Sequence, residues 1–164
     1  PGEFMEVVQI GAVKLDACTL APLDELDLLV TPRFNPRLSP YFERLTGITG
    51  EMLAARGMDF AQAYDRFVAF AAAGTIAAFR RDDLVLLENM RLYGIRDTAA
   101  LPPFLNLRDW FGTNGVDPRG MHSCDIGPSL GVPFEGQTHD ALNDSRSIAA
   151  AMRVMATRGA RIAA

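Results

Sequence analysis

An imidazole and a carboxylate stand five residues apart near the end of the sequence, where they have the chemistry of a general base and a metal ligand. His139 is followed by Asp144, and an apolar pattern of helical period runs from Ala141 to near Gly159. Asp144 is therefore predicted in the first turns of a helix, where the dipole favours a carboxylate. His139 precedes that helix on backbone that need not be helical, so its ring can be aimed at the same space. The alternative for either residue alone is structural: a dipole partner and a hydrogen-bonded histidine.

Another candidate carboxylate opens a predicted helix in the middle of the chain. Asp82 or Asp83 follows a short apolar strand predicted at 75–79 and begins a helix that contains Leu86 and Asn89. At 3.6 residues per turn, Asp82 shares a face with Leu86 and Asn89, whereas Asp83 does not. Asp82 is therefore the preferred site residue. The alternative is that either aspartate only caps the helix.

The charge of the chain limits how it can hold nucleic acid. A formal net charge of −4 argues against a broad basic binding surface, because such binding depends on neutralising many phosphates. An enzyme that grips a few terminal nucleotides remains compatible, since divalent cations convert an acidic pocket into a phosphate site. Arg80 and Arg81 directly precede the central aspartates and carry groups that bind phosphate, although a solvated turn also explains them.

Length and composition favour one domain over residues 1–164. With 49% hydrophobic residues, the chain can bury a single sizeable core. No apolar run approaches the roughly 20 residues of a membrane-spanning helix. Cys18 and Cys124 lack metal-ligand spacing and are interpreted as reduced thiols, which predicts a cytoplasmic protein.

The predicted elements suit an α/β sheet with helices on both faces. An initial pair of strands is expected to be antiparallel, and aromatic residues at helical spacing in 60–72 are expected in the core rather than on a base-stacking surface. Strands are predicted at 5–15, 25–30, 75–79 and 104–107, and helices at 41–45, 49–55, 60–72, 82–93, 109–111, 123–130 and 141–159.

Several motifs together resemble one known family. Residues 139–149 spell His-x-Ala-x-x-Asp followed by Ser-Arg-Ser-Ile-Ala, which resembles the third motif of the His-type DEDD 3′-to-5′ exonucleases. The spacing Asp82-x-x-x-Leu86-Leu87-x-Asn89 is similar to the second motif of that family. Residues 45–49, Leu-Thr-Gly-Ile-Thr, and 6–13 are similar to its recurring loop sequence and second strand. The resemblance covers nearly the whole chain.

The resemblance implies an RNase H-like fold, with a central mixed β-sheet flanked by helices on both faces. It also implies hydrolysis of nucleotides from the 3′ end of single-stranded RNA or DNA by a mechanism that uses two Mg²⁺ or Mn²⁺ ions. Asp82 and Asp144 are the implied metal ligands, and His139 is the implied base that accepts a proton from the attacking water.

One motif of the family is absent. Its Asp-x-Glu should lie on a strand that precedes Met5, so the chain is expected to be truncated at its N-terminus and incomplete for catalysis. Glu3 and Glu6 are poor substitutes, because neither belongs to an Asp-x-Glu. The alternative function is a non-catalytic RNase H-like module that binds nucleic-acid ends or a protein partner. The sequence leaves RNA against DNA open, because that choice depends on contacts to the 2′-hydroxyl.

Overall fold

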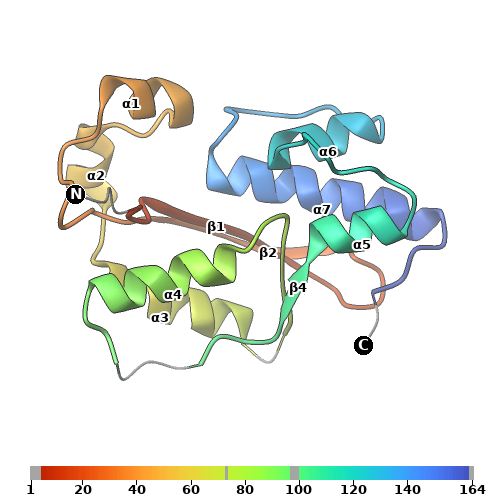
Figure 1. The fold of residues 1–164 in the computed structure, drawn as a ribbon, viewed down its shortest axis with the longest axis horizontal. Helices are drawn as coiled ribbons and strands as arrows, with labels where there is room; N and C mark the ends of the chain where they lie inside the picture. Colours follow the sequence, from red (N-terminus) through yellow and green to blue (C-terminus); the bar gives the residue numbers. More distant parts are fainter. Residues whose placement is uncertain (1–4, 73, 97–99, 163–164) are drawn as a thin grey trace.

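A computed structural model describes residues 5–72, 74–96 and 100–162 of the chain (Figure 1). Strands and helices alternate in the order expected of an α/β protein. The strands are β1 (Gln9–Leu15), β2 (Pro22–Leu29), β3 (Ile76–Ala78) and β4 (Phe104–Asn106). The helices are α1 (Pro40–Thr46), α2 (Gly50–Arg56), α3 (Phe60–Ala71), α4 (Asp82–Leu92), α5 (Leu107–Thr113), α6 (Ser123–Ser129) and α7 (Ala141–Thr157).

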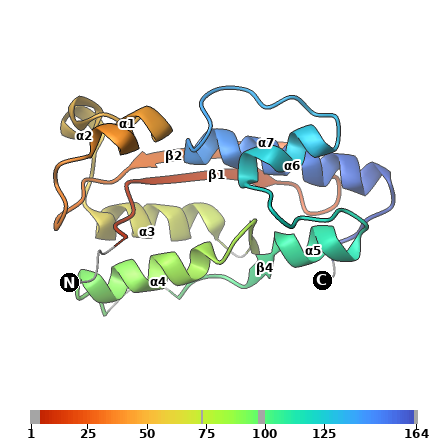
Figure 2. The ribbon, with the colours of Figure 1, turned by 45° about the horizontal axis from the view of Figure 1, so that its top comes forward.

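The β1–β2 pair forms the middle layer of the molecule. The two strands run antiparallel, with Gln9 opposite Leu29 and Ile10 opposite Leu28. Figure 2 shows α7 on one side of this pair and α3 on the other, and both helices contact both strands. The predicted arrangement of helices on both faces is confirmed.

The sequence analysis expected one mixed sheet with both parallel and antiparallel strands. In the described part of the chain, these two kinds of pairing occur in two separate small sheets. β3 pairs with β4 in parallel, Ile76 opposite Phe104, and stands apart from the antiparallel β1–β2 pair. Both β3 and β4 are three residues long. The described residues therefore leave sheet edges that no backbone ladder covers.

Several boundaries differ from the sequence prediction. β1 begins at Gln9 rather than residue 5, and α7 ends at Thr157 rather than residue 159. β2 begins at Pro22 rather than residue 25. The sequence did not predict its first half, because those residues are exposed and lack the alternation that marks a half-buried strand.

α5 begins at Leu107, earlier than the predicted helical turn at 109–111. The Asn106 side chain caps α5 by accepting a hydrogen bond from the Arg108 backbone N–H (3.1 Å). Because the helix starts there, β4 ends at Asn106 rather than at the predicted residue 107.

The core lies on both sides of the β1–β2 pair. One cluster joins these strands to α3 and α4, and it buries Phe60, Tyr64 and Phe67 almost completely. The prediction that these aromatics are core residues is confirmed. A second cluster joins α5, α6 and the later turns of α7 through Phe79, Phe111 and other apolar residues.

No helix in the described ranges combines the length and hydropathy needed to cross a bilayer. Cys18 and Cys124 are both free thiols.

Candidate active site at the start of α7

Strand β1 holds the first residues of α7 through one glutamine. The Gln9 side chain donates from Nε2 to Oδ2 of Asp140 (2.8 Å) and accepts at Oε1 from the Ala141 backbone N–H (2.8 Å). Asp140 is the N-cap of α7, and its other oxygen accepts from the Asn143 backbone N–H (2.9 Å). These bonds satisfy backbone N–H groups in the first turn of α7 that have no acceptor within the helix, and they hold α7 against β1.

A glycine in β1 allows the close approach of strand and helix. A Cβ built on Gly11 would lie 2.7 Å from the Ala141 carbonyl oxygen and closer still to the backbone of Leu142. Ser145 also donates from Oγ to the Gly11 carbonyl (3.0 Å). The first turn of α7 therefore rests directly on the backbone of β1.

His139 lies just before α7 in the left-handed region of backbone space. Its φ of 62° is uncommon for a residue with a side chain and costs on the order of 1 kcal/mol. His139 leaves its side chain exposed and lies close enough to Asp144 to favour the ionised form of that carboxyl, which opposes the rise in its pKa caused by burial. The expectation of a non-helical His139 next to a first-turn Asp144 is confirmed.

The Asp144 carboxylate is half-buried and only partly satisfied. Its Oδ1 is buried and has no hydrogen-bond partner among the described residues. Desolvation raises the pKa of Asp144, and the nearby charges of Asp140 and Asp125 act in the same direction, against the influence of His139. A buried carboxylate oxygen without a donor costs free energy, so this atom fits the ligand of a cation.

Asp82 is the first residue of α4 and does not cap it. The N-cap is Arg81, which makes no side-chain capping bond, so the capping alternative is not supported for Asp82. The Asp82 side chain is open to solvent, yet protein atoms beside it remove enough water to raise its pKa, and the charge of Asp83 adds to this shift. Asp83 differs, because its bond to Arg81 lowers its pKa. Of these two neighbouring aspartates, Asp82 is the one whose carboxylate is not paired with Arg81.

The predicted register of α4 agrees with the structure. Leu86 and Asn89 are buried, whereas Leu87 is 37% exposed. The Asn89 side chain accepts from the Val7 backbone N–H (2.9 Å) and donates to the Met5 carbonyl (2.9 Å). Asn89 thereby ties α4 to the segment before β1, a role that the sequence analysis missed.

The structure brings His139 and Asp144 together but shows no direct interaction of either with Asp82. Figures 1 and 2 place the first turns of α4 and α7 near the middle of the molecule, on opposite sides of β1. Within residues 5–72, 74–96 and 100–162, no three His, Cys, Asp or Glu side chains are grouped closely enough to hold a metal ion. The site therefore has two separate carboxylates and one adjacent imidazole.

A second histidine lies beside the first. The His122 ring meets the His139 ring edge-on, with centroids 6.0 Å apart and planes at 72°. His122 stands at the start of α6, where its backbone N–H donates to Asp125 (2.8 Å). The sequence analysis missed this residue, because the loop between α6 and α7 separates the two histidines in the chain.

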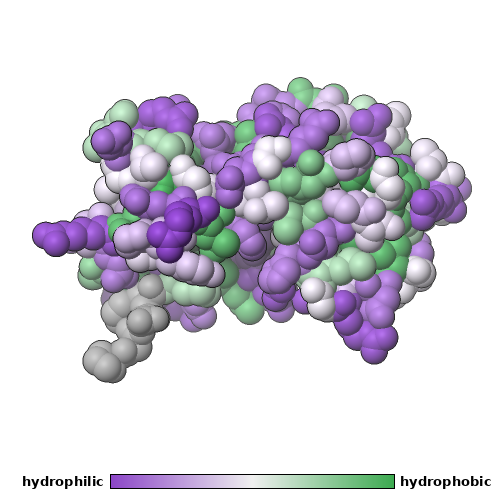
Figure 3. Space-filling view, turned by 90° about the horizontal axis from the view of Figure 1, so that it is seen from above, coloured by the Kyte–Doolittle hydropathy of each residue, from purple (hydrophilic) through white to green (hydrophobic). Residues whose placement is uncertain are grey.

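An open hollow of about 200 Å³ adjoins His139. Figure 3 shows a depression between the part of the surface that carries α1 and α2 and the part that carries α6 and α7. Gln137 bridges these parts by donating to the Leu45 carbonyl (3.0 Å). The hollow is lined by Glu6, Val8, Gln9, Phe42, Thr46, Ile48, His139 and Ala141.

Glu6 is committed to a structural role, which agrees with the expectation that it is a poor substitute for the Asp-x-Glu motif. Its carboxylate accepts hydrogen bonds from the backbone N–H groups of Arg33 (2.7 Å) and Asn35 (2.6 Å) and from the Tyr93 hydroxyl (2.7 Å). Partial burial opposes ionisation, but these bonds outweigh it and lower the pKa of Glu6. Glu6 therefore holds the loop after β2 and does not act as a third site carboxylate.

Comparison with known proteins identifies relatives over nearly the whole chain. The family model described as Exonuclease matches residues 3–152. Curated proteins from Mus musculus and Homo sapiens, both named 3′-5′ exoribonuclease 1, are 26% identical over 161 residues. These matches cover 91% of this chain and 46% of each relative, so the chain spans about half the length of those proteins.

Solved structures show the same fold. A 3′-exonuclease described in 3′-end-specific recognition of a histone mRNA stem-loop aligns with a TM-score of 0.84 at 22% identity, covering 98% of this chain and 76% of that one. The nuclease domain of 3′hExo, a DEDDh family member bound to rAMP, aligns with a TM-score of 0.82 at 21% identity, covering 96% and 84%. Cell-death related nuclease 4 aligns with a TM-score of 0.79 at 23% identity, covering 95% and 58%. The RNase H-like fold expected from the motifs is confirmed.

Proposed function

Because this chain belongs to the exonuclease family, we propose that it hydrolyses nucleotides from the 3′ end of single-stranded RNA or DNA. The observation that carries the proposal is the buried, unpartnered Oδ1 of Asp144 beside the exposed His139. A structural aspartate would be hydrogen-bonded, whereas a metal ligand keeps an oxygen without a protein donor. The resemblance to His-type DEDD exonucleases supports the same roles for both residues.

Asp144 and Asp82 offer carboxylate oxygens of the kind that divalent cations bind, although the described residues do not group three such ligands together. When bound, two Mg²⁺ or Mn²⁺ ions supply the positive charge that stabilises the leaving 3′-oxygen and acidifies water. Asp144 and Asp82 would hold them, because hard cations prefer carboxylate oxygens. His139 would accept the proton of the attacking water at its imidazole, since histidine exchanges protons near neutral pH.

The names of the relatives favour RNA as the substrate to test first. Two curated relatives are called exoribonucleases, and one similar structure holds rAMP. An open hollow also lies beside His139. Single-stranded RNA is thus the first substrate class, with DNA as the comparison.

The test combines metal binding with 3′-end degradation. Calorimetric titration with Mn²⁺ should show binding that Asp144→Asn weakens, with Asp83→Asn as the matched control because its carboxylate is bound to Arg81. Degradation of 5′-labelled oligonucleotides should be followed for the 164-residue chain and for the chain preceded by a strand that carries Asp-x-Glu. We expect progressive 3′ shortening by the extended protein and weak or no cleavage by the shorter one, because two carboxylates are too few for two divalent ions.

Two results would contradict the proposal. The metal site would be wrong if Asp144→Asn and Asp83→Asn bound Mn²⁺ equally well. Oligonucleotide binding without cleavage by the extended protein would favour the non-catalytic module instead.

A further inference from the structure

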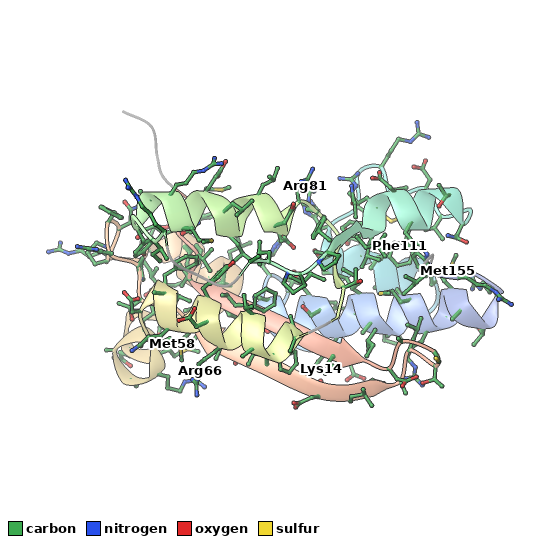
Figure 4. All side chains as sticks on the ribbon, turned by 90° about the horizontal axis from the view of Figure 1, so that it is seen from below. Lys14, Met58, Arg66, Arg81, Phe111 and Met155 are labelled. Atoms are coloured by element: carbon green, nitrogen blue, oxygen red, sulfur yellow. The ribbon has the colours of Figure 1, made fainter. Side chains whose placement is uncertain are left out.

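Two consecutive arginines precede α4, and the structure gives them different surroundings. Arg81 donates from Nε to Oδ1 of Asp83 (2.9 Å) and from Nη2 to Oδ2 (2.7 Å). Its guanidinium also lies over the Phe104 ring, 5.6 Å from the centroid. Figure 4 shows Arg81 at the end of α4 that faces α5. Two of the five N–H donors of Arg81 are thus bonded to Asp83.

Arg80 is exposed and makes no hydrogen bond or ion pair with any described residue. It stands two positions before Asp82, and its positive charge is close enough to favour the ionised form of that carboxylate. A guanidinium carries five N–H donors and stays protonated, so Arg80 presents a full set of donors beside a proposed metal ligand.

Other arginines around the two site carboxylates are committed. Arg146, on the first turns of α7, donates from Nε to Glu25 (2.9 Å). Arg108 donates to the Pro118 carbonyl (2.9 Å) and lies over the Phe79 ring. Unlike these two, Arg80 makes no hydrogen bond with any of the residues that the structure describes.

We infer that Arg80 binds a backbone phosphate of the nucleic-acid strand beside Asp82, whereas Arg81 holds the start of α4 and does not contact the strand. This inference rests on the proposed function. A nucleic-acid strand that enters this site approaches two carboxylates on a protein with a net charge of −4. A positively charged side chain near its path therefore reduces the electrostatic repulsion of its phosphates. Arginine suits this role because its planar group matches two phosphate oxygens at once.

The test measures binding, so it does not depend on catalysis. Fluorescence anisotropy would follow a 5′-labelled single-stranded oligouridylate with the 164-residue protein in Ca²⁺, over a series of NaCl concentrations, with oligothymidylate in parallel. Losing one phosphate contact should weaken binding at about 50 mM salt roughly tenfold relative to about 1 M salt, because each contact to a single strand contributes about 0.7 to the slope. It should also make the slope of log K against log salt shallower by that value, about 0.7. Arg80→Ala should show both changes, and Arg80→Lys should restore most of the slope.

Two arginine variants serve as controls. Arg81→Ala should lower the temperature of unfolding, because it removes the bonds to Asp83, and should leave the salt slope unchanged. Arg158→Ala removes an exposed charge at the far end of α7 and should change neither. Thermal unfolding of every variant separates loss of structure from loss of binding, and Arg80→Gln replaces Arg80→Ala if the alanine variant does not fold.

Equal affinity and equal slope for Arg80→Ala and Arg158→Ala would overturn the inference and leave the proposed function standing. A shallower slope for Arg81→Ala but not for Arg80→Ala would also overturn it. If the folded wild-type protein bound neither oligonucleotide, this inference would fail, whereas the proposed function is judged separately by cleavage with the extended protein.

Discussion

Replacing Gly11 with alanine should destabilise the protein and displace the candidate site. The added Cβ would lie 2.7 Å from the Ala141 carbonyl oxygen, and the obstructing atoms belong to backbone rather than to a flexible side chain. Relief therefore requires the first turn of α7 to move away from β1 by roughly an ångström, since carbon–oxygen contacts are relaxed near 3.5 Å. That movement would strain the bonds from Gln9 to Asp140 and Ala141.

Overpacking of this kind costs about 3 kcal/mol when the neighbour cannot rotate away. For a protein of this size, each kcal/mol lowers the melting temperature by about 2–4 °C, so Gly11→Ala should melt about 6–12 °C below wild type. Thermal unfolding followed by circular dichroism measures the shift, and Mn²⁺ titration of the folded variant reports the displacement of Asp144.

Gly50→Ala is the matched control. Gly50 is the first residue of α2, and a Cβ there meets nothing within 4 Å. Alanine should leave the melting temperature unchanged or raise it slightly, because it restricts the unfolded chain. If Gly11→Ala melted at the same temperature as Gly50→Ala, the proposed contact between β1 and α7 would be wrong.

Three further outcomes are expected. His139→Ala in an active, extended protein should lower single-turnover cleavage by roughly two to four orders of magnitude, with Mn²⁺ affinity nearly unchanged; a rate within threefold of wild type would reject its role as base. Asp82→Asn should impair Mn²⁺ binding and cleavage far more than Asp83→Asn, and the reverse order would shift the register of the second motif by one residue. Glu6→Gln should lower the melting temperature at pH 7, and the difference should shrink as the pH falls below the ordinary value of 4.5. The sign follows because a lowered pKa gives stability above the unfolded-state value that is lost as the pH falls through the folded-state value; an unchanged difference at acid pH would contradict it.

The site residues on α7 were predictable because their signals are local. His139, the N-cap Asp140 and Asp144 lie within six residues, and the helical period after them is regular. The choice of Asp82 over Asp83 also followed from helix register. The structure adds that the Asp83 carboxylate is hydrogen-bonded to Arg81.

The contacts that hold these elements in place were not predictable from the sequence. Gln9 and Asp140 are 131 positions apart, and Asn89 and Met5 are 84 apart. Nothing in the local pattern of either strand or helix specifies such pairs, because they depend on how the sheet and helices pack. The same reason explains why the division of the strands into two small sheets did not follow from the order of elements.

Two buried side-chain oxygens on α7 lack partners among the described residues, and their surroundings distinguish packing from function. Ser147 Oγ faces Gly127 of α6, where a Cβ would come within 2.6 Å, so this hydroxyl fills the closest approach of two helices. Its burial is explained by packing, and an alanine there would leave no charge unsatisfied. Asp144 Oδ1 has no such explanation, because a charged oxygen without a donor opposes folding far more than a neutral hydroxyl does. The left-handed backbone of His139 adds a second cost beside it, and the bonds from Gln9 and Ser145 offset both costs by fastening the same turn to β1. Strain that is concentrated at one point and supported by surrounding contacts is the pattern of a site kept for binding, which is why Asp144, and not Ser147, is assigned to the cation.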